Sequence, residues 1–318
     1  MEQEKTPGRR KRSLREYVKI FFCGAIMGAA DVVPGVSGGT MAFILGIYNE
    51  LLDSIKEVLA PKTAKMALKF RIGEMYRTLP WPFLLALALG ILSAIVLFAS
   101  PLKYMLEHRL VLILSFFFGL VLGSAATVLR QVEKWRADRI IALVLGAAAG
   151  FLIVGLPMLA DPPEGKWYLV LCGAVAICAM ILPGISGSFI LLLMGRYDYV
   201  LNAVHEIKSR VNLSQNLLTL LLFCCGILVG IAGFVRLLSW LLRKYHDLTV
   251  AVLIGFMLGS LRKVWPWKAG DVLNNANVLP ACDSGLLTAA VLVLAGFFLV
   301  LIVEHIAGKM ERKQQETC

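Results

Sequence analysis

Apolar residues occur along this chain in long runs that polar segments separate. A helix needs about 20 apolar residues to cross the hydrocarbon core of a membrane. Six runs predict spanning helices: 82–102, 110–129, 140–159, 216–240, 248–263 and 286–305. The run at 248–263 is the shortest of the six. The pattern therefore predicts an all-α polytopic membrane protein.

Two further apolar regions, 17–52 and 167–203, are interrupted near their middle by a proline and glycines. Because proline lacks an N–H and glycine weakens a helix, each region is expected to divide into two short helices. Each arm of about 15 residues would extend about 22 Å, which is short for a membrane span. We predict two re-entrant hairpins, while arms that cross fully stay an alternative. The structural breaks are Pro34, Gly35, Pro183 and Gly184.

The two halves of the chain are related in sequence. Six residues recur at an offset of 149: Pro34, Gly35, Ser37, Gly38, Gly46 and Tyr48 match Pro183, Gly184, Ser186, Gly187, Gly195 and Tyr197. Two later blocks recur in the same order, 119–124 at 255–260 and 149–151 at 295–297. Repeats over 17–160 and 167–306 would each hold one hairpin and three spanning helices. Because three crossings are an odd number, the sequence predicts an inverted-topology repeat.

Composition and charge agree with a membrane protein. Hydrophobic residues make up 58% of the chain and charged residues 17%, and the mean hydropathy is +0.77. The net charge of +11 arises from basic residues between the apolar runs, which indicates membrane topology and not nucleic-acid binding. A cytoplasmic N-terminus places 22 Lys and Arg inside and 9 outside. The basic segment 1–16 and the tail 307–318 are both predicted to be cytoplasmic.

The two breaks are the strongest candidate for a binding site. Each second arm begins just after its break, and a helix N-terminus offers unpaired N–H donors and a partial positive charge. Two such tips that meet near the membrane centre would bind a phosphate or a carboxylate. The alternative is that each motif is only a turn with a serine N-cap. The candidate phosphate-binding residues are Ser37, Gly38, Gly39, Thr40, Ser186, Gly187 and Ser188.

Three charged residues near the predicted spans are further candidates, because ionisable groups in a membrane are costly. Asp31 precedes the first break, and its repeat partner is Met180. This asymmetry favours a group that couples transport to a proton or sodium ion, or else a hydrogen-bonded structural carboxylate. Arg196 could contact an anionic headgroup at the outer mouth or anchor the surface. Arg236 lies about one turn from the cytoplasmic end of its helix, where it could also snorkel to the interface.

Several patterns of common enzymes are missing from the sequence. It has no H-E-x-x-H, no metal-ligand cluster and no G-x-x-x-x-G-K-[ST]. No metal or cofactor is therefore predicted apart from a possible coupling ion, H⁺ or Na⁺. Broken helices within inverted repeats are typical of secondary transporters that work by alternating access. From the residues alone we predict an anion-binding transporter of this kind.

The segment from Gly28 to Thr40, with Asp31-Val32-Val33-Pro34-Gly35 at its centre, is repeated as Ile181 to Ser188. This paired motif resembles the PopT family of polyprenyl-phosphate translocases, and the resemblance covers about 17–306. It implies a protein of the bacterial plasma membrane that returns undecaprenyl phosphate from the outer to the inner leaflet. That step recycles the lipid carrier of peptidoglycan and other envelope polymers. The second copy departs from the first at Ser188 and Phe189.

Two alternatives remain at this stage. A transporter of a soluble anion would use the same tips with an aqueous cavity. An undecaprenyl-pyrophosphate phosphatase has the similar motif P-G-x-S-R-S, but Gly38 replaces its arginine here and no two glutamates lie four residues apart. Without those groups a transferring phosphoryl group would be poorly stabilised. The expected partners are a polyprenyl phosphate and the bilayer, and the sequence predicts no oligomeric state.

Overall fold

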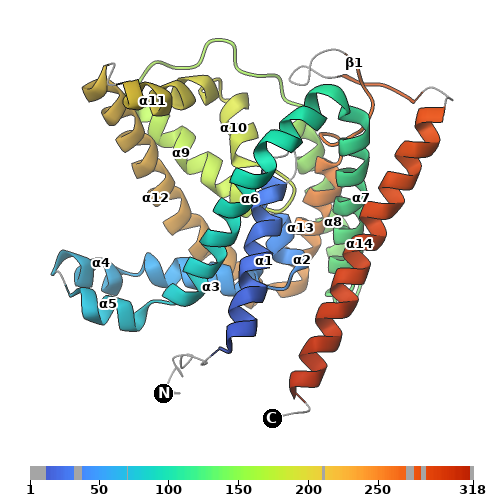
Figure 1. The fold of residues 1–318 in the computed structure, drawn as a ribbon, viewed down its shortest axis with the longest axis horizontal. Coiled ribbons are helices and arrows are strands. Elements are labelled where there is room, and N and C mark those ends of the chain that lie inside the picture. The colour runs from blue at the N-terminus through green and yellow to red at the C-terminus, as the bar shows by residue number, and fades with distance from the viewer. Residues whose placement is uncertain are drawn as a thin grey trace.

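A computed structural model of the chain describes residues 12–31, 38–69, 71–209, 212–269, 276–280 and 284–315, which are mostly helical (Figure 1). The first half contains α1 (Leu14–Asp31), α2 (Gly38–Ile44), α3 (Tyr48–Val58), α4 (Pro61–Leu68), α5 (Ile72–Thr78), α6 (Trp81–His108), α7 (Leu110–Leu129) and α8 (Ala137–Val154). The second half contains α9 (Lys166–Ile181), α10 (Gly187–Leu193), α11 (Tyr197–Ser209), α12 (Leu213–Lys244), α13 (His246–Ser260) and α14 (Ser284–Gln315). The strands β1 (Lys268–Ala269) and β2 (Ala276–Asn277) form an antiparallel pair between α13 and α14.

The six helices that the apolar runs predict are all present, as α6, α7, α8, α12, α13 and α14. Five described helices are long and apolar enough to cross a membrane: α6, α7, α8, α12 and α14. The sixth, α13, has 15 residues and corresponds to the shortest of the apolar runs. The structure is therefore mostly helical with five candidate membrane-spanning helices, which is consistent with an all-α polytopic membrane protein.

Each interrupted region contains separate helices on the two sides of its interruption, but the second arms are shorter than predicted. The first arms, α1 and α9, have 18 and 16 residues, whereas α2 and α10 have only seven each. The prediction of two arms of about 15 residues was therefore wrong for the second arms. Gly46 and Gly195 follow α2 and α10 with φ of +70° and +66°, a conformation that ends a helix and favours glycine. A third helix, α3 or α11, follows each of these turns.

The long helices pack in four close pairs: α1 with α6, α9 with α12, α7 with α14, and α8 with α13. Glycines allow this close approach. Gly90 of α6 lies against a backbone carbonyl of α1, and Gly226 of α12 lies against one of α9. Gly119 of α7 and Gly255 of α13 approach α14 and α8 in the same way. A side chain at any of these positions would collide with the neighbouring backbone, as is common where helices pack in membranes.

The elements that follow the two hairpins lie at opposite ends of the molecule. In Figure 1, α3, α4 and α5 lie at the lower end of the molecule, the end at which α1 also begins and α14 ends. In the same view α11 and the strand pair lie at the upper end. The largest buried hydrophobic cluster joins α1, α2 and α7 of the first half to α12 and α13 of the second. The two halves therefore share one core.

Candidate functional site

The first break is closed by a contact between its two ends. Asp31 is the last residue of α1, and its carboxylate accepts a hydrogen bond of 2.6 Å from the backbone N–H of Gly38, the first residue of α2. A Cβ at position 38 would lie 2.6 Å from the other carboxylate oxygen, so only glycine fits there without a shift. Gly39 is buried beside it. A carboxylate of the protein thus occupies the start of α2, where we expected a phosphate.

Several predicted residues of the first tip fall outside this description. Pro34, Gly35 and Ser37 lie outside the described residues, and Thr40 belongs to α2 although its side chain is not described. The predicted roles of these four residues stay predictions.

The second break is described in full. Ser186 caps α10, because its hydroxyl accepts a hydrogen bond of 3.2 Å from the backbone N–H of Phe189 and lies 3.2 Å from the Ser188 hydroxyl. Ser186 is buried, whereas Ser188 is exposed. Gly184 has φ of +101°, and a Cβ there would lie 2.6 Å from the Ser260 hydroxyl oxygen of α13. The serine N-cap is thus real at Ser186, and anion binding by this tip stays a prediction.

The two hairpins meet beside the second break. The helix α2 packs on α9, and the buried Tyr48 hydroxyl at the start of α3 donates a hydrogen bond of 3.0 Å to the carbonyl of Ile181, the last residue of α9. Pro183 is buried two residues further along. Gly187 holds α10 close to α9, since a Cβ there would lie 2.6 Å from the Ala176 carbonyl oxygen. The structure therefore brings hairpin residues of both halves together.

The two predicted arginines bond to backbone carbonyls in loops. Arg196 donates a hydrogen bond of 2.6 Å to the Pro163 carbonyl and stacks on the ring of Tyr199, with 5.1 Å between the guanidinium and the ring centre. It thereby ties the α8–α9 loop to α11. Arg236 is exposed and reaches the carbonyl of Leu59, just beyond α3, at 3.4 Å. The predicted roles of Arg196 in binding and of Arg236 in coupling stay predictions.

An apolar groove of about 590 Å³ lies beside the first break, between α1, α2, α6, α7 and α14. Its wall contains almost no polar atoms. Ala30 and Met41 line it; Ala30 directly precedes Asp31, and Met41 follows Gly38 by three residues on α2. The groove is open to the surface of the protein, since its lining residue Leu97 is 67% exposed. No sequence pattern predicted this groove, since its wall comes from five helices that are distant in the chain.

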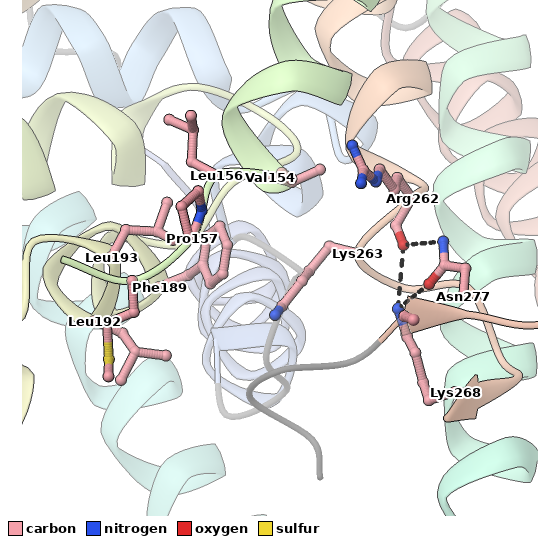
Figure 2. Close-up of a pocket in the computed structure, with 13 residues that line it drawn as sticks. Val154, Leu156, Pro157, Phe189, Leu192, Leu193, Arg262, Lys263, Lys268 and Asn277 are labelled. Atoms are coloured by element: carbon pink, nitrogen blue, oxygen red, sulfur yellow. Dashed lines mark hydrogen bonds between the residues drawn. The ribbon is translucent and has the colours of Figure 1, made fainter. Parts of the chain in front are cut away.

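A second pocket, of about 290 Å³, is lined by three cations (Figure 2). It lies between the end of α8, α10, the loop after α13 and the strand pair. Figure 2 shows the Lys263 side chain extending toward the Phe189 ring, and its ammonium lies 4.4 Å from the ring centre. Lys268 donates hydrogen bonds to the Arg262 carbonyl, at 3.2 Å, and to the Asn277 side-chain oxygen, at 2.6 Å. We name Arg262, Lys263, Lys268 and Asn277 the basic pocket.

The basic pocket is electrostatically strained. Burial lowers the pKa of the Lys263 ammonium. Burial, together with the charges of Lys263 and Arg262, lowers the pKa of Lys268 to about 8. Among the described residues, no carboxylate forms an ion pair with any of the three cations. The sequence signal for this site was the presence of these cations on the predicted external side, where few basic residues are expected.

Groups of three or more side chains suited to hold a metal ion do not occur in the described part of the chain.

Comparison with known proteins gives consistent matches. The family described as undecaprenyl phosphate translocase-like matches residues 27–279. A protein named polyprenyl-phosphate transporter from Vibrio cholerae serotype O1 is 40% identical over 312 residues, which cover 92% of this chain and 98% of that protein. A protein of the same name from Staphylococcus aureus is 30% identical over 258 residues, covering 76% of this chain and 84% of that protein. No solved structure matches the chain significantly.

Proposed function

This chain belongs to the undecaprenyl phosphate translocase-like family, and we propose from that premise that it carries undecaprenyl phosphate from the outer to the inner leaflet of the bacterial plasma membrane. It is a transporter and not an enzyme. The observation that carries the proposal is the apolar groove that opens beside the polar break between α1 and α2. A polyprenyl phosphate needs an apolar surface for its chain and a polar one for its phosphate, and these two lie side by side here.

The groove suits the lipid tail of such a substrate. Moving a phosphate out of water without hydrogen-bond partners costs several kcal/mol of free energy. A polyprenyl chain, by contrast, is already in an apolar environment in the bilayer and gains no free energy by leaving it. A carrier therefore has to shelter the headgroup and leave the tail in an apolar environment. If the exposed rim at Leu97 faces the lipid, the tail would remain partly in the bilayer while Ala30 and Met41 guide it toward the break.

The headgroup would pass the break in competition with Asp31. The Gly38 N–H that should bind an anion already donates to the Asp31 carboxylate. Two anions in one site of low dielectric repel each other, so a phosphate can bind only after Asp31 moves away or takes up a cation. This exchange gives Asp31 a role in coupling to H⁺ or Na⁺. Phosphate contacts with the glycine and serine tips of both breaks belong to this proposal.

Alternating access would arise from two inverted halves. The pairing of α1 with α6 corresponds, under the sequence repeat, to that of α9 with α12. The pairing of α7 with α14 corresponds in the same way to that of α13 with α8. The equivalent helices α3 and α11 lie at opposite ends of the molecule (Figure 1). These features support an inverted repeat with re-entrant hairpins, in which both termini are cytoplasmic.

A leaflet-exchange experiment tests this function. The purified full-length chain is reconstituted in liposomes that contain a headgroup-labelled undecaprenyl phosphate, and the exposure of the label to an external quencher is followed with time. We expect label from the inner leaflet to become accessible only in liposomes that contain the protein. Uptake of radioactive inorganic phosphate is measured in parallel. Phosphate uptake without lipid exchange would establish a soluble-anion transporter instead.

A further inference from the structure

We propose that the basic pocket is a capture site for the phosphomonoester headgroup at the outer mouth of the transporter. The proposal rests on the proposed function for the identity of the lipid and for the outward orientation of this end. It adds a site distinct from the two breaks. Its core residues are Arg262, Lys263 and Lys268.

The charge of the pocket is the first argument. The three residues are all the Lys and Arg of segment 262–285, on the side where the positive-inside bias disfavours them. They are half-buried, which makes their mutual repulsion stronger than at an open surface. The acidic residues of this segment, Asp271 and Asp283, lie outside the described residues. Such a cluster is stabilised when a dianion binds, and a phosphomonoester is close to a dianion at pH 7.

The free donors of the pocket are the second argument. Among the described residues, no oxygen accepts a hydrogen bond from the Lys263 ammonium, whose described partner is the face of the Phe189 ring. The Lys268 ammonium donates its described hydrogen bonds to the Arg262 carbonyl and the Asn277 side-chain oxygen. Asn277 is itself held in place, because its side chain donates a hydrogen bond of 3.0 Å to the same Arg262 carbonyl. The strand pair thus holds one lysine in place, and the other remains available. The Arg262 guanidinium donates a hydrogen bond of 3.2 Å to the Phe151 carbonyl and contributes its charge, while the two ammonium groups at the cavity supply charge-assisted donors for a phosphate.

The position of the pocket is the third argument. The backbone N–H of Lys263 donates a hydrogen bond of 2.8 Å to the carbonyl of Ser260, whose hydroxyl abuts Gly184 of the second break. Phe189, which lines the pocket, follows the capping Ser186 by three residues. The basic pocket therefore lies next to the second break, and a headgroup bound in it would be close to that break. The lining from α8 and α10 is apolar and would face the first isoprene units of the tail.

Binding measurements on the detergent-solubilised full-length chain test the proposal. The probes are inorganic phosphate and a short-chain isoprenyl phosphate, each titrated by calorimetry. We expect Lys263→Gln and Lys268→Gln each to weaken isoprenyl phosphate binding by about tenfold or more, as expected for loss of a charge-assisted bond. Lys263→Arg should retain most of the affinity. The matched control is Lys166→Gln, which removes an exposed cation elsewhere on the predicted external side and should bind as the wild type does.

A pH series on the wild-type chain gives a second test that needs no variant. The charged groups that line the pocket are Arg262, Lys263 and Lys268, while α8 and α10 contribute no titratable side chain to it. Without a bound ligand the pKa of Lys268 is about 8, so its ammonium loses a proton as the pH rises through that value. We expect the affinity for isoprenyl phosphate to fall between pH 7 and pH 9. A flat profile would argue against the site.

The outcomes separate this proposal from the function. Unchanged affinity in both glutamine variants would overturn the capture site, even if leaflet exchange were normal. Weakened binding in both variants, combined with a wild-type chain that exchanges no lipid, would retain an anion site and overturn the function. Equal affinity for inorganic phosphate and isoprenyl phosphate would show that the pocket binds the phosphate group alone. A preference for the isoprenyl form would show that the apolar wall takes part.

Discussion

Replacing Gly38 by alanine is the sharpest perturbation of the first break. The new Cβ would lie 2.6 Å from one Asp31 carboxylate oxygen, whereas ordinary contacts of a Cβ begin near 3.4 Å. The carboxylate must therefore retreat by about 0.8 Å. Because N–H···O bonds weaken beyond about 3.2 Å, a shift of this size breaks the 2.6 Å bond between the Gly38 N–H and Asp31.

The expected magnitude follows from the strength of that bond. A hydrogen bond to a charged group contributes about 1.5–3 kcal/mol. Its loss reduces the fraction of chains with this arrangement of the tip by about 10- to 150-fold. Because the tip must return to this arrangement after each headgroup leaves, we expect Gly38→Ala to slow leaflet exchange by at least about tenfold, in liposomes with matched protein density. The control is Gly233→Ala on α12, where a Cβ meets no atom within 4 Å.

A double-mutant cycle shows whether the effect passes through Asp31. If the alanine acts by displacing the carboxylate, Gly38→Ala should cost little further activity in an Asp31→Ala background, because contacting residues are not additive. Wild-type exchange by Gly38→Ala would refute the reasoning. So would fully additive losses in the double variant, since they would mean that the two residues act independently.

Three further variants probe other parts of the account. Asp31→Asn keeps an oxygen that can accept a hydrogen bond from the Gly38 N–H but removes the charge. Lipid exchange should then lose its dependence on an imposed ion gradient. Full dependence would exclude Asp31 as the coupling group. Ala29→Phe puts a ring into the apolar groove and should slow lipid exchange strongly. Its control, Ala148→Phe on the exposed face of α8, should not slow exchange. Equal rates in the two variants would exclude the groove as the path of the tail. Tyr48→Phe leaves the Ile181 carbonyl without its 3.0 Å bond and should lower stability by about 1 kcal/mol, and an unchanged thermal midpoint would show that the contact between the hairpins is not stabilising.

The spanning helices were predictable because a helix that crosses the bilayer needs an apolar composition over a fixed length. The exact ends of these helices were harder to predict. The helix expected to end at 102 continues through Pro101 to His108, and the run at 216–240 becomes α12 over Leu213–Lys244. A helix can extend into the interface with polar residues, where hydropathy no longer marks it. Apolar runs therefore locate the membrane part of a helix and not its termini.

The hairpins show where a visible signal was interpreted incompletely. The prolines and glycines located both breaks, and their recurrence at a fixed offset related the halves. The same repeat also aligned Gly46 with Gly195, and both adopt positive φ at the ends of the short helices. Taking these glycines as helix C-caps would have predicted the seven-residue arms.

The candidate site was predictable only in part. Asp31 was selected from its position and from the broken symmetry with Met180, but its partner Gly38 was expected to bind a substrate instead. The basic pocket was missed because Lys263 and Lys268 become neighbours only when the strand pair folds back on the loop after α13. The apolar groove needs the packing of five helices, which no local pattern encodes.

Photo-crosslinking of the lipid tail shows whether the tail occupies the apolar groove. A polyprenyl phosphate with a photoreactive terminal isoprene is bound to the reconstituted full-length chain, and the labelled peptides are mapped by mass spectrometry. We expect label at groove residues such as Phe22, Leu97 and Phe117, and loss of that label when unmodified polyprenyl phosphate competes. Equal labelling of the exposed face of α8, for example at Leu145, without competition would contradict this expectation.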